Sequence, residues 1–178
     1  VMRGLDDLVA AGKLDYVALS DAPAWIASQA NTLAALRGWS PFVALQVEYS
    51  LIERTADREL LPVAEAFGLS VTAWAPMGAG ILTGKYTRGP STLPEDSRRA
   101  AANQARLTER NLQIAREVDR VADELGATSA QVAVAWVRQR GRWVIPILGV
   151  RTLEQFQELL GGLDLELPAE HFARLRDA

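Results

Sequence analysis

The chain has 178 residues, 49% of them hydrophobic, with 19 basic and 22 acidic side chains and a formal net charge of −3. This size and apolar content suit one globular domain. The scattered, slightly acidic charge predicts no nucleic-acid partner. The lack of a long apolar run or leader pattern predicts no membrane span. With no cysteine and one histidine, His171, the sequence predicts no disulfide and no metal site, and we expect a cytoplasmic protein.

Apolar runs of strand length alternate with stretches of helical periodicity. The predicted strands are residues 14–19, 43–47, 69–73 and 144–148. The predicted helices are residues 24–36, 57–67, 107–125, 129–138 and about 153–160, and Pro168 is predicted to open a last short helix as its first residue. Gly68 and Gly126 are predicted to end helices, and Thr128 to cap the one that follows.

This alternation predicts an α/β fold with a parallel sheet, either doubly wound or part of a (β/α)8 barrel. A Rossmann domain is disfavoured because the first unit has no G-x-G-x-x-G motif. In both folds, ligands bind at the carboxyl ends of the strands. The candidate site residues therefore lie in four segments: residues 20–21, 46–49, 74–80 and 146–152.

The third strand is followed by a glycine-rich loop, residues 74–86, with the sequence W-A-P-M-G-A-G-I-L-T-G-K-Y. Its glycines let a ligand approach the backbone, Lys85 adds a positive charge, and Trp74 offers a flat aromatic face. The loop predicts a site for a phosphate-bearing ligand.

Four segments, taken in order, resemble the aldo-keto reductases, and most of all the branch with the bacterial reductases and the potassium-channel β subunits. They are residues 5–13 (L-D-D-L-V-A-A-G-K), 46–54 (Q-V-E-Y-S-L-I-E-R), 74–86, and 146–155 (P-I-L-G-V-R-T-L-E-Q). The resemblance implies a TIM-type (β/α)8 barrel that binds NADP(H) in an extended form without a Rossmann domain.

The resemblance also implies that residues 1–178 form one C-terminal half of such a barrel, covering about the last four βα units and a C-terminal helix. The family's catalytic Asp, Tyr, Lys and His belong to the other half. Tyr16, Tyr49, Tyr86 and His171 do not match those positions. We therefore assign no catalytic residue and expect the isolated chain to be inactive.

On the nicotinamide side, the resemblance implies that Ser20, Asp21 and Gln46 hold the carboxamide and that Trp74 stacks on the ring. Asp21 stands where the family usually has an asparagine, so an amide donor is replaced by a carboxylate. The structural alternatives are that Ser20 caps a helix, that Gln46 satisfies backbone groups and that Trp74 belongs to the core.

For the pyrophosphate, the implied contacts are backbone N–H groups of the loop and two cations. They are Ala75, Pro76, Met77, Gly78 and Ala79, with Lys85 and Arg98 as the cations. Arg98 falls in a long polar segment, residues 87–107, which we expect to be a mobile lid over the cofactor. The alternative for both cations is simple solvation.

For the adenosine 2′-phosphate, the implied contacts are Arg151 and Thr152, with Gly149 allowing close approach and the next helix adding its N-terminal dipole. This favours NADP over NAD. Gln155 and Glu158 would face the adenine, while Leu159 replaces an asparagine common in the family. The alternative is an ordinary amphipathic helix with a solvated face.

Two hypotheses follow. The chain is the cofactor-binding half of an NADP(H)-dependent oxidoreductase that reduces aldehydes or ketones, with a small carbonyl compound as substrate. Alternatively, it is a non-catalytic half-barrel that acts by association with a complementary half-barrel or with itself, because an open half leaves strand edges exposed.

Overall fold

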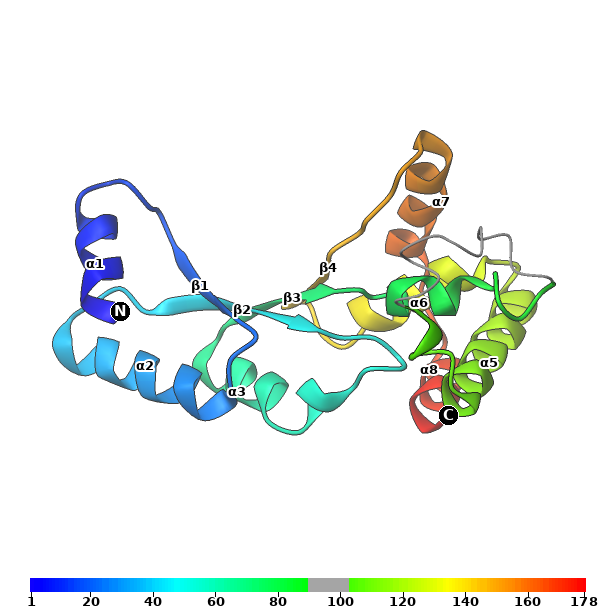
Figure 1. Cartoon of the computed structure of the whole chain (residues 1–178), viewed down its shortest axis with the longest axis horizontal. Coiled ribbons are helices and arrows are strands. Elements are labelled where there is room, and N and C mark those ends of the chain that lie inside the picture. The colour runs from blue at the N-terminus through cyan, green and yellow to red at the C-terminus, as the bar shows by residue number, and fades with distance from the viewer. Residues whose placement is uncertain (90–102) are drawn as a thin grey trace.

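A computed structural model describes residues 1–89 and 103–178 and shows an α/β fold (Figure 1). The strands are β1 (Val17–Ser20), β2 (Phe42–Glu48), β3 (Ser70–Trp74) and β4 (Val144–Pro146). The helices are α1 (Met2–Ala10), α2 (Ala24–Arg37), α3 (Leu60–Phe67), α5 (Glu109–Leu125), α6 (Ser129–Arg138), α7 (Leu153–Asp164) and α8 (Ala169–Asp177), and two 3-10 segments are η1 (Thr55–Asp57) and η2 (Gly78–Thr83). None of the helices in these two ranges has the length and apolar character that a membrane crossing requires.

The four strands form one parallel sheet in the order β1-β2-β3-β4. Each strand pairs with its neighbour in sequence, without the reversal of order that defines a doubly wound sheet. Within the described residues, this order agrees with a segment of a (β/α)8 barrel and not with the doubly wound alternative.

The strand register gives the sheet one covered and one uncovered face. Leu19, Leu45, Val71 and Val144 lie in one cross-strand row, and all but the partly buried Leu19 are fully buried beneath helices. The next cross-strand row lies on the other face of the sheet and consists of Ser20, Gln46, Thr72 and Ile145. There, Ser20, Gln46 and Ile145 are exposed, which is unusual because both faces of a parallel sheet are normally covered.

The predicted elements are present, with shifted ends. Residues 14–16 precede β1 as exposed chain, β4 ends at Pro146, and α3 begins at Leu60 because residues 55–57 form η1 instead. Pro168 is the N-cap of α8 and not its first helical residue. Gly68 and Gly126 end α3 and α5 in the left-handed conformation, and Thr128 forms a capping box with Gln131, all as predicted.

Helix α2 buries a different face from the one that its large apolar side chains suggest. Trp25, Leu33 and Leu36 are exposed, whereas the buried side is made of alanines and Asn31. The Asn31 amide donates to the carbonyl of Phe42 (3.0 Å) and accepts from the Phe42 N–H (2.9 Å). A polar residue thus fixes α2 to the start of β2, because its amide satisfies both backbone groups.

The main core lies between the covered face of the sheet and helices α3, α5, α6 and α8. Its centre is Trp136 of α6, which is fully buried and stacks on Tyr49 and on Phe172 at ring-centroid distances of 5.6 and 5.8 Å. Helices α6 and α7 approach closely at Gly162, where a Cβ atom would lie 3.0 Å from the carbonyl oxygen of Gln131.

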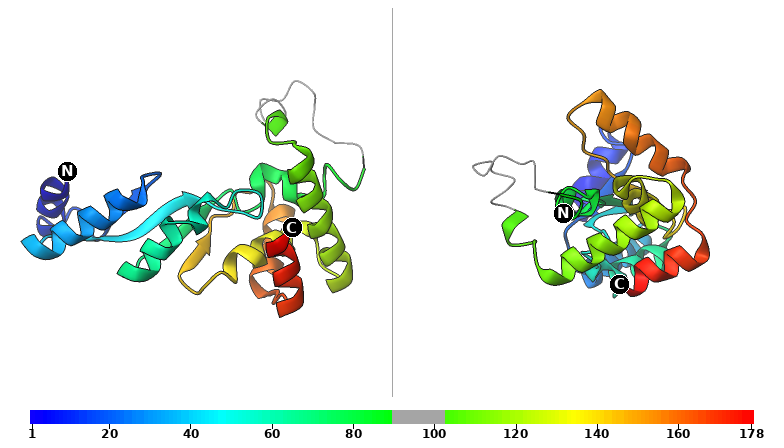
Figure 2. Two further views of the ribbon diagram at one scale, coloured as in Figure 1. Left: turned by 90° about the horizontal axis from the view of Figure 1, so that it is seen from below. Right: turned by 90° about the vertical axis from the view of Figure 1, so that its right-hand side faces the viewer.

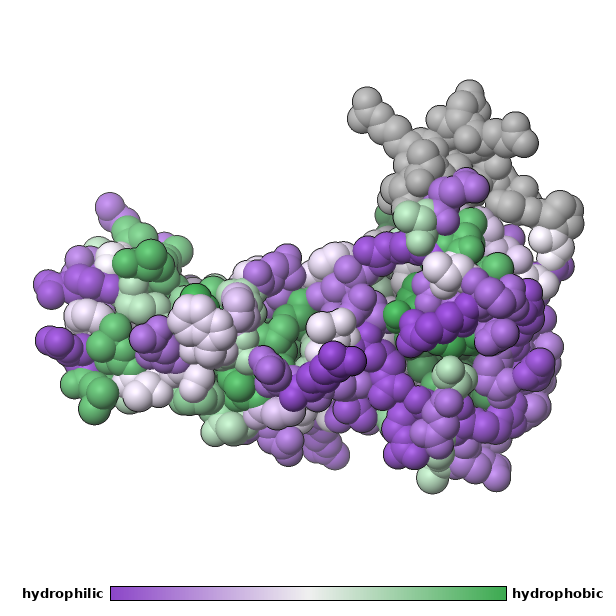
Figure 3. All heavy atoms as spheres, turned by 60° about the horizontal axis from the view of Figure 1, so that its bottom comes forward, coloured by the Kyte–Doolittle hydropathy of each residue, from purple (hydrophilic) through white to green (hydrophobic). Residues whose placement is uncertain are grey.

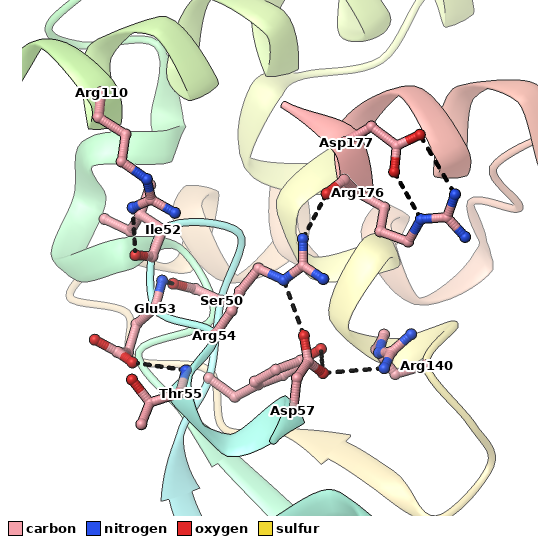
Figure 4. A network of polar contacts seen from close by, with 11 residues as sticks. Ser50, Ile52, Glu53, Arg54, Thr55, Asp57, Arg110, Arg140, Arg176 and Asp177 are labelled. Carbon is pink, nitrogen blue, oxygen red and sulfur yellow. Dashed lines mark hydrogen bonds and ion pairs between the residues drawn. The ribbon is translucent and has the colours of Figure 1, made fainter.

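A polar network fastens the connection after β2 to the C-terminal helices (Figure 4). The Asp57 carboxylate accepts from the Tyr49 hydroxyl (2.8 Å), from Arg54 (2.9 Å) and from Arg140 (3.0 Å). Arg54 also donates to the carbonyl of Arg176 in α8 (2.5 Å). Burial, and then the hydrogen bond to Asp57, raise the pKa of Tyr49 above its ordinary value. This tyrosine is a structural group of the core.

The molecule is elongated, with α1 and α2 at one end and the cluster of α5, α6, α7 and α8 at the other (Figures 1 and 2). In the view of Figure 3, the end with α5 and α8 is mainly hydrophilic, whereas apolar surface is interspersed over the other end. The uneven surface agrees with the exposed apolar side chains of α2.

Candidate functional site

A pocket of about 720 Å³ opens at the carboxyl end of the sheet, next to β3 and β4. Its wall is built from the loop after β3, from the connection between β4 and α7, and from the first turns of α7. The lining residues are Trp74, Ala75, Pro76, Met77, Ala79, Gly80, Thr83, Lys85, Asn103, Ala130, Ile147, Gly149, Val150, Arg151, Gln155, Glu158 and Leu159. The pocket lies beyond the strand ends where the sequence predicts that a ligand binds.

The glycine-rich loop is folded through several left-handed residues. Ala75 and Ala79 have φ values of 52° and 56°, a conformation that is costly for residues with a Cβ atom. Gly78 is also left-handed, and a Cβ atom there would lie 2.5 Å from Cδ1 of Ile52, so a larger residue would have to displace that side chain. The loop is therefore held in its shape by its surroundings and not by local preference.

Not all backbone donors of this loop face the pocket. The Gly78 N–H donates to the carbonyl of Ala75 (2.8 Å) and the Gly80 N–H to that of Met77 (3.0 Å). Gly78 itself is buried and does not line the pocket. The expectation that residues 75–79 all present N–H groups to a ligand is therefore wrong for Gly78, because its donor closes a turn within the loop, and for Pro76, because proline has no backbone N–H.

Lys85 lines the pocket and lies close to the loop. Its Nζ is 5.0 Å from the ring centroid of Tyr86, within the range of a cation–π contact. A Cβ atom on Gly80 would lie 2.6 Å from the same Nζ, so a larger residue here would displace the ammonium group from its present position. Asn103 lies alongside and donates to the Ala79 carbonyl (3.1 Å) and to the Tyr86 hydroxyl (3.2 Å).

Arg151 and the first turns of α7 also border the pocket. Thr152 is the N-cap of α7, and its hydroxyl accepts from the Gln155 N–H (3.3 Å). The Gln155 side-chain oxygen in turn accepts from the Arg151 N–H (3.0 Å), which orders the connection before the helix. Thr152 does not line the pocket.

The back of the pocket is apolar. Leu159 of α7 is 4% exposed and packs with Ala130 and Val134 of α6, next to Met77. A leucine fits this position because its neighbours are hydrocarbon. The residue predicted to weaken adenine recognition is thus part of a packed wall.

Ser20, Asp21 and Gln46 lie outside the pocket lining. Ser20 and Gln46 are register partners on the uncovered face of the sheet, and the Ser20 hydroxyl donates to the Gln46 carbonyl (3.2 Å). Trp74 pairs with Glu48 in the next row of this face, two residues further along β2. The predicted nicotinamide contacts therefore share a face with Trp74, although the pocket begins only at the tryptophan. Ser20 does not cap α2, whose N-cap is Pro23.

Ion pairs fix the chain on both sides of residues 90–102. Arg88 donates to Asp123 (2.8 Å) and to the carbonyl of Asp119 (2.8 Å). Arg106 forms a two-point ion pair with Glu48, whose carboxylate raises the pKa of the guanidinium. The predicted lid, residues 87–107, lies for the most part outside the described residues, and so does Arg98.

Of the predicted residues in the described ranges, ten line the pocket: Trp74, Ala75, Pro76, Met77, Ala79, Lys85, Gly149, Arg151, Gln155 and Glu158. Five do not, namely Ser20, Asp21, Gln46, Gly78 and Thr152. Asn103 is the main lining residue that sequence reasoning missed, because it is one amide beside a long polar segment and carries no spacing signal.

The pocket combines two cations, Lys85 and Arg151, with one carboxylate, Glu158, a half-buried indole and an apolar back wall. Such a surface fits an elongated ligand with anionic groups and at least one flat ring. The described residues do not form a group of three or more His, Asp or Glu side chains that could hold a metal ion.

Comparison with known proteins adds to this description. The family model of the Aldo/keto reductase family matches residues 1–178. The chain is 34% identical to the uncharacterized oxidoreductase YrpG of Bacillus subtilis over 99% of the chain and 52% of the relative. It is 32% identical to the NADP(+) aryl-alcohol dehydrogenase of Phanerodontia chrysosporium (99% and 47%) and 30% identical to norsolorinic acid reductase of Aspergillus flavus (100% and 44%). The chain spans about half the length of these curated relatives.

Proposed function

The chain belongs to the aldo/keto reductase family, and on that premise we propose that it is the NADP(H)-binding half of a barrel oxidoreductase that interconverts small aldehydes or ketones and alcohols. A nicotinamide cofactor supplies a hydride when it is bound. We assign no proton donor to this chain, and we propose that the catalytic groups belong to a complementary half. A cytoplasmic location stays a prediction from composition.

The observation that carries the proposal is that two cations from different segments line one pocket. Lys85 stands on the glycine-rich loop, and Arg151 stands in the connection before the N-terminus of α7. A dinucleotide phosphate has anionic groups at two separate points, its pyrophosphate and its 2′-phosphate. Two separated cations, one of them at a helix N-terminus, match that distribution of charge.

The other lining residues support the same occupant. Trp74 offers a half-buried indole at the end of β3 on which a nicotinamide ring can stack. Gln155 and Glu158 offer polar groups for an adenine, while Leu159 and Met77 form an apolar surface behind it. Gly149 has nothing within 4 Å of an added Cβ position, so its place in the wall leaves room for a ligand.

The test is a fluorescence titration of the chain with NADPH and with NADH. We expect Arg151→Ala to weaken NADPH binding about tenfold and NADH binding far less, because a charge-assisted contact to the 2′-phosphate contributes about 1.5–3 kcal/mol and this arginine is exposed. Arg142→Ala is the matched control, because Arg142 is also exposed but does not line the pocket. An equal loss for both dinucleotides would refute the 2′-phosphate assignment.

A second proposal concerns partners: the chain associates through its open sheet, with a complementary half-barrel or with another copy. In the described residues, β1 and β4 each pair on one side only, and Ile145 on the uncovered face is 51% exposed. Parallel sheets are otherwise covered on both faces, so this surface favours a partner.

Light scattering after size exclusion tests this association over a range of concentrations. We expect an oligomer that Ile145→Asp shifts toward monomer. Leu36→Asp on α2, at a site that is 78% exposed, should leave the mass unchanged. A wild-type monomer at every concentration would rule out self-association and leave the complementary half as the partner to test.

A further inference from the structure

Asn103 connects Ala79, which lines the pocket, with Tyr86, near the other end of the glycine-rich loop. Its side-chain amide donates to the carbonyl of Ala79 (3.1 Å) and to the hydroxyl of Tyr86 (3.2 Å). Asn103 is 4% exposed and lines the pocket together with Ala79. One buried amide therefore spans both ends of the segment that carries Gly80 and Lys85.

The segment that Asn103 spans is strained. Ala79 is held at a φ of 56°, and Gly80 and Gly84 follow at 95° and 81°. A left-handed alanine costs roughly 1–2 kcal/mol and persists only where the surroundings hold it. The amide of Asn103 hydrogen-bonds the carbonyl of that same alanine, so it opposes the relaxation of the loop at its most strained residue.

The segment also carries the ammonium group of the pocket. Lys85 Nζ lies over the ring of Tyr86 at 5.0 Å from its centroid, and it also lies beside Gly80, where an added Cβ atom would be 2.6 Å away. Asn103 holds the hydroxyl of that ring and the carbonyl next to that glycine. A single residue thus hydrogen-bonds the ring beneath the lysine and the residue before Gly80.

We propose that Asn103 is a positioning residue: by holding Ala79 and Tyr86 together, it keeps Lys85 directed at the anionic group of the ligand. The proposal rests on the proposed function in that the ligand is NADP(H). Asn103 acts through Lys85, so its contribution to binding exists only while the lysine is present.

A double-mutant cycle tests this dependence, with NADPH affinity measured for wild type, Asn103→Ala, Lys85→Ala and the double variant. We expect Asn103→Ala to weaken binding about five- to tenfold in the wild-type background, the effect of losing a hydrogen bond of about 1 kcal/mol and the positioning that it provides. In the Lys85→Ala background the same change should alter the affinity less than twofold. Asn111→Ala is the matched control, because Asn111 donates to the Arg106 carbonyl (2.8 Å) and does not line the pocket.

Two outcomes of the cycle would overturn the proposal. One is an unchanged affinity of Asn103→Ala. The other is an equal loss in both backgrounds, because Asn103 would then act independently of Lys85.

Proteolysis provides a readout that does not depend on NADPH. The sequence has two lysines, Lys13 and Lys85, so a lysine-specific protease has one target in the loop and one internal reference near the N-terminus. We expect Asn103→Ala to accelerate cleavage after Lys85 severalfold and to leave cleavage after Lys13 unchanged, because local opening governs cleavage. Equal acceleration at both sites would show global destabilisation and overturn the positioning role, as would no acceleration at all. If the wild type binds no NADPH but Asn103→Ala still accelerates cleavage after Lys85 selectively, the proposed cofactor is wrong, and the role of Asn103 in holding the loop is supported.

Discussion

Replacement of Asp57 by alanine tests whether the polar network after β2 holds the C-terminal helices to the sheet. The carboxylate accepts three hydrogen bonds, from Tyr49, Arg54 and Arg140, at 2.8–3.0 Å. Tyr49 is fully buried, and the side chains of Arg54 and Arg140 are each 28% exposed. In Asp57→Ala, one buried hydroxyl loses its acceptor and two partly exposed cations lose their counter-charge.

The expected loss in the free energy of unfolding is about 3–4 kcal/mol. A buried donor left without an acceptor costs roughly 1–3 kcal/mol, and breaking a buried ion pair costs about 3–5 kcal/mol, here reduced because both arginines are partly solvated. Asp57→Asn keeps an acceptor for the tyrosine but loses the charge, so its loss should be about half as large.

Urea unfolding followed by circular dichroism gives the measurement, with Asp7→Ala as the control. Asp7 pairs with Arg3 at 3.0 Å on the open surface, where the side chains are 61% and 70% exposed, so its removal should have no measurable effect. A loss below about 1 kcal/mol for Asp57→Ala would refute the view that this network stabilises the fold.

Two further predictions follow from other contacts. The pKa of Tyr49 is raised in the folded state by burial and by Asp57. The contribution of this residue to stability is therefore complete below the ordinary tyrosine pKa of about 10 and is lost as the pH rises above that value. In urea titrations, Tyr49→Phe should flatten the fall in stability above about pH 10, and an unchanged slope would contradict this reasoning. Gly162→Ala should lower the free energy of unfolding by about 1–3 kcal/mol, because its Cβ atom would lie 3.0 Å from the Gln131 carbonyl oxygen. Gly4→Ala in α1 is the control: an added Cβ atom there has nothing within 4 Å, so this change should raise the free energy of unfolding by up to about 1 kcal/mol. Similar effects at both sites would show that α6 and α7 are not closely packed.

Local signals in the sequence were sufficient to predict most elements and the edge of the sheet at which the pocket lies. Periodicity predicted the four strands and most helices, and Gly68, Gly126 and Thr128 were predicted to mark helix ends that the structure confirms. These features depend on neighbours within a few residues, so they can be read without knowing the fold. The loop from Trp74 to Tyr86 was predicted to lie at a strand end for the same reason.

The tertiary structure alone decided which of those residues meet. It separated Ser20 and Gln46 from the pocket, turned the Gly78 N–H into a closing bond of the loop, and placed Asn103 against Ala79 and Tyr86. It also exposed Trp25 and Leu36 of α2 while burying Asn31. Such outcomes depend on contacts between residues distant in sequence, where packing and hydrogen-bond satisfaction override the local pattern.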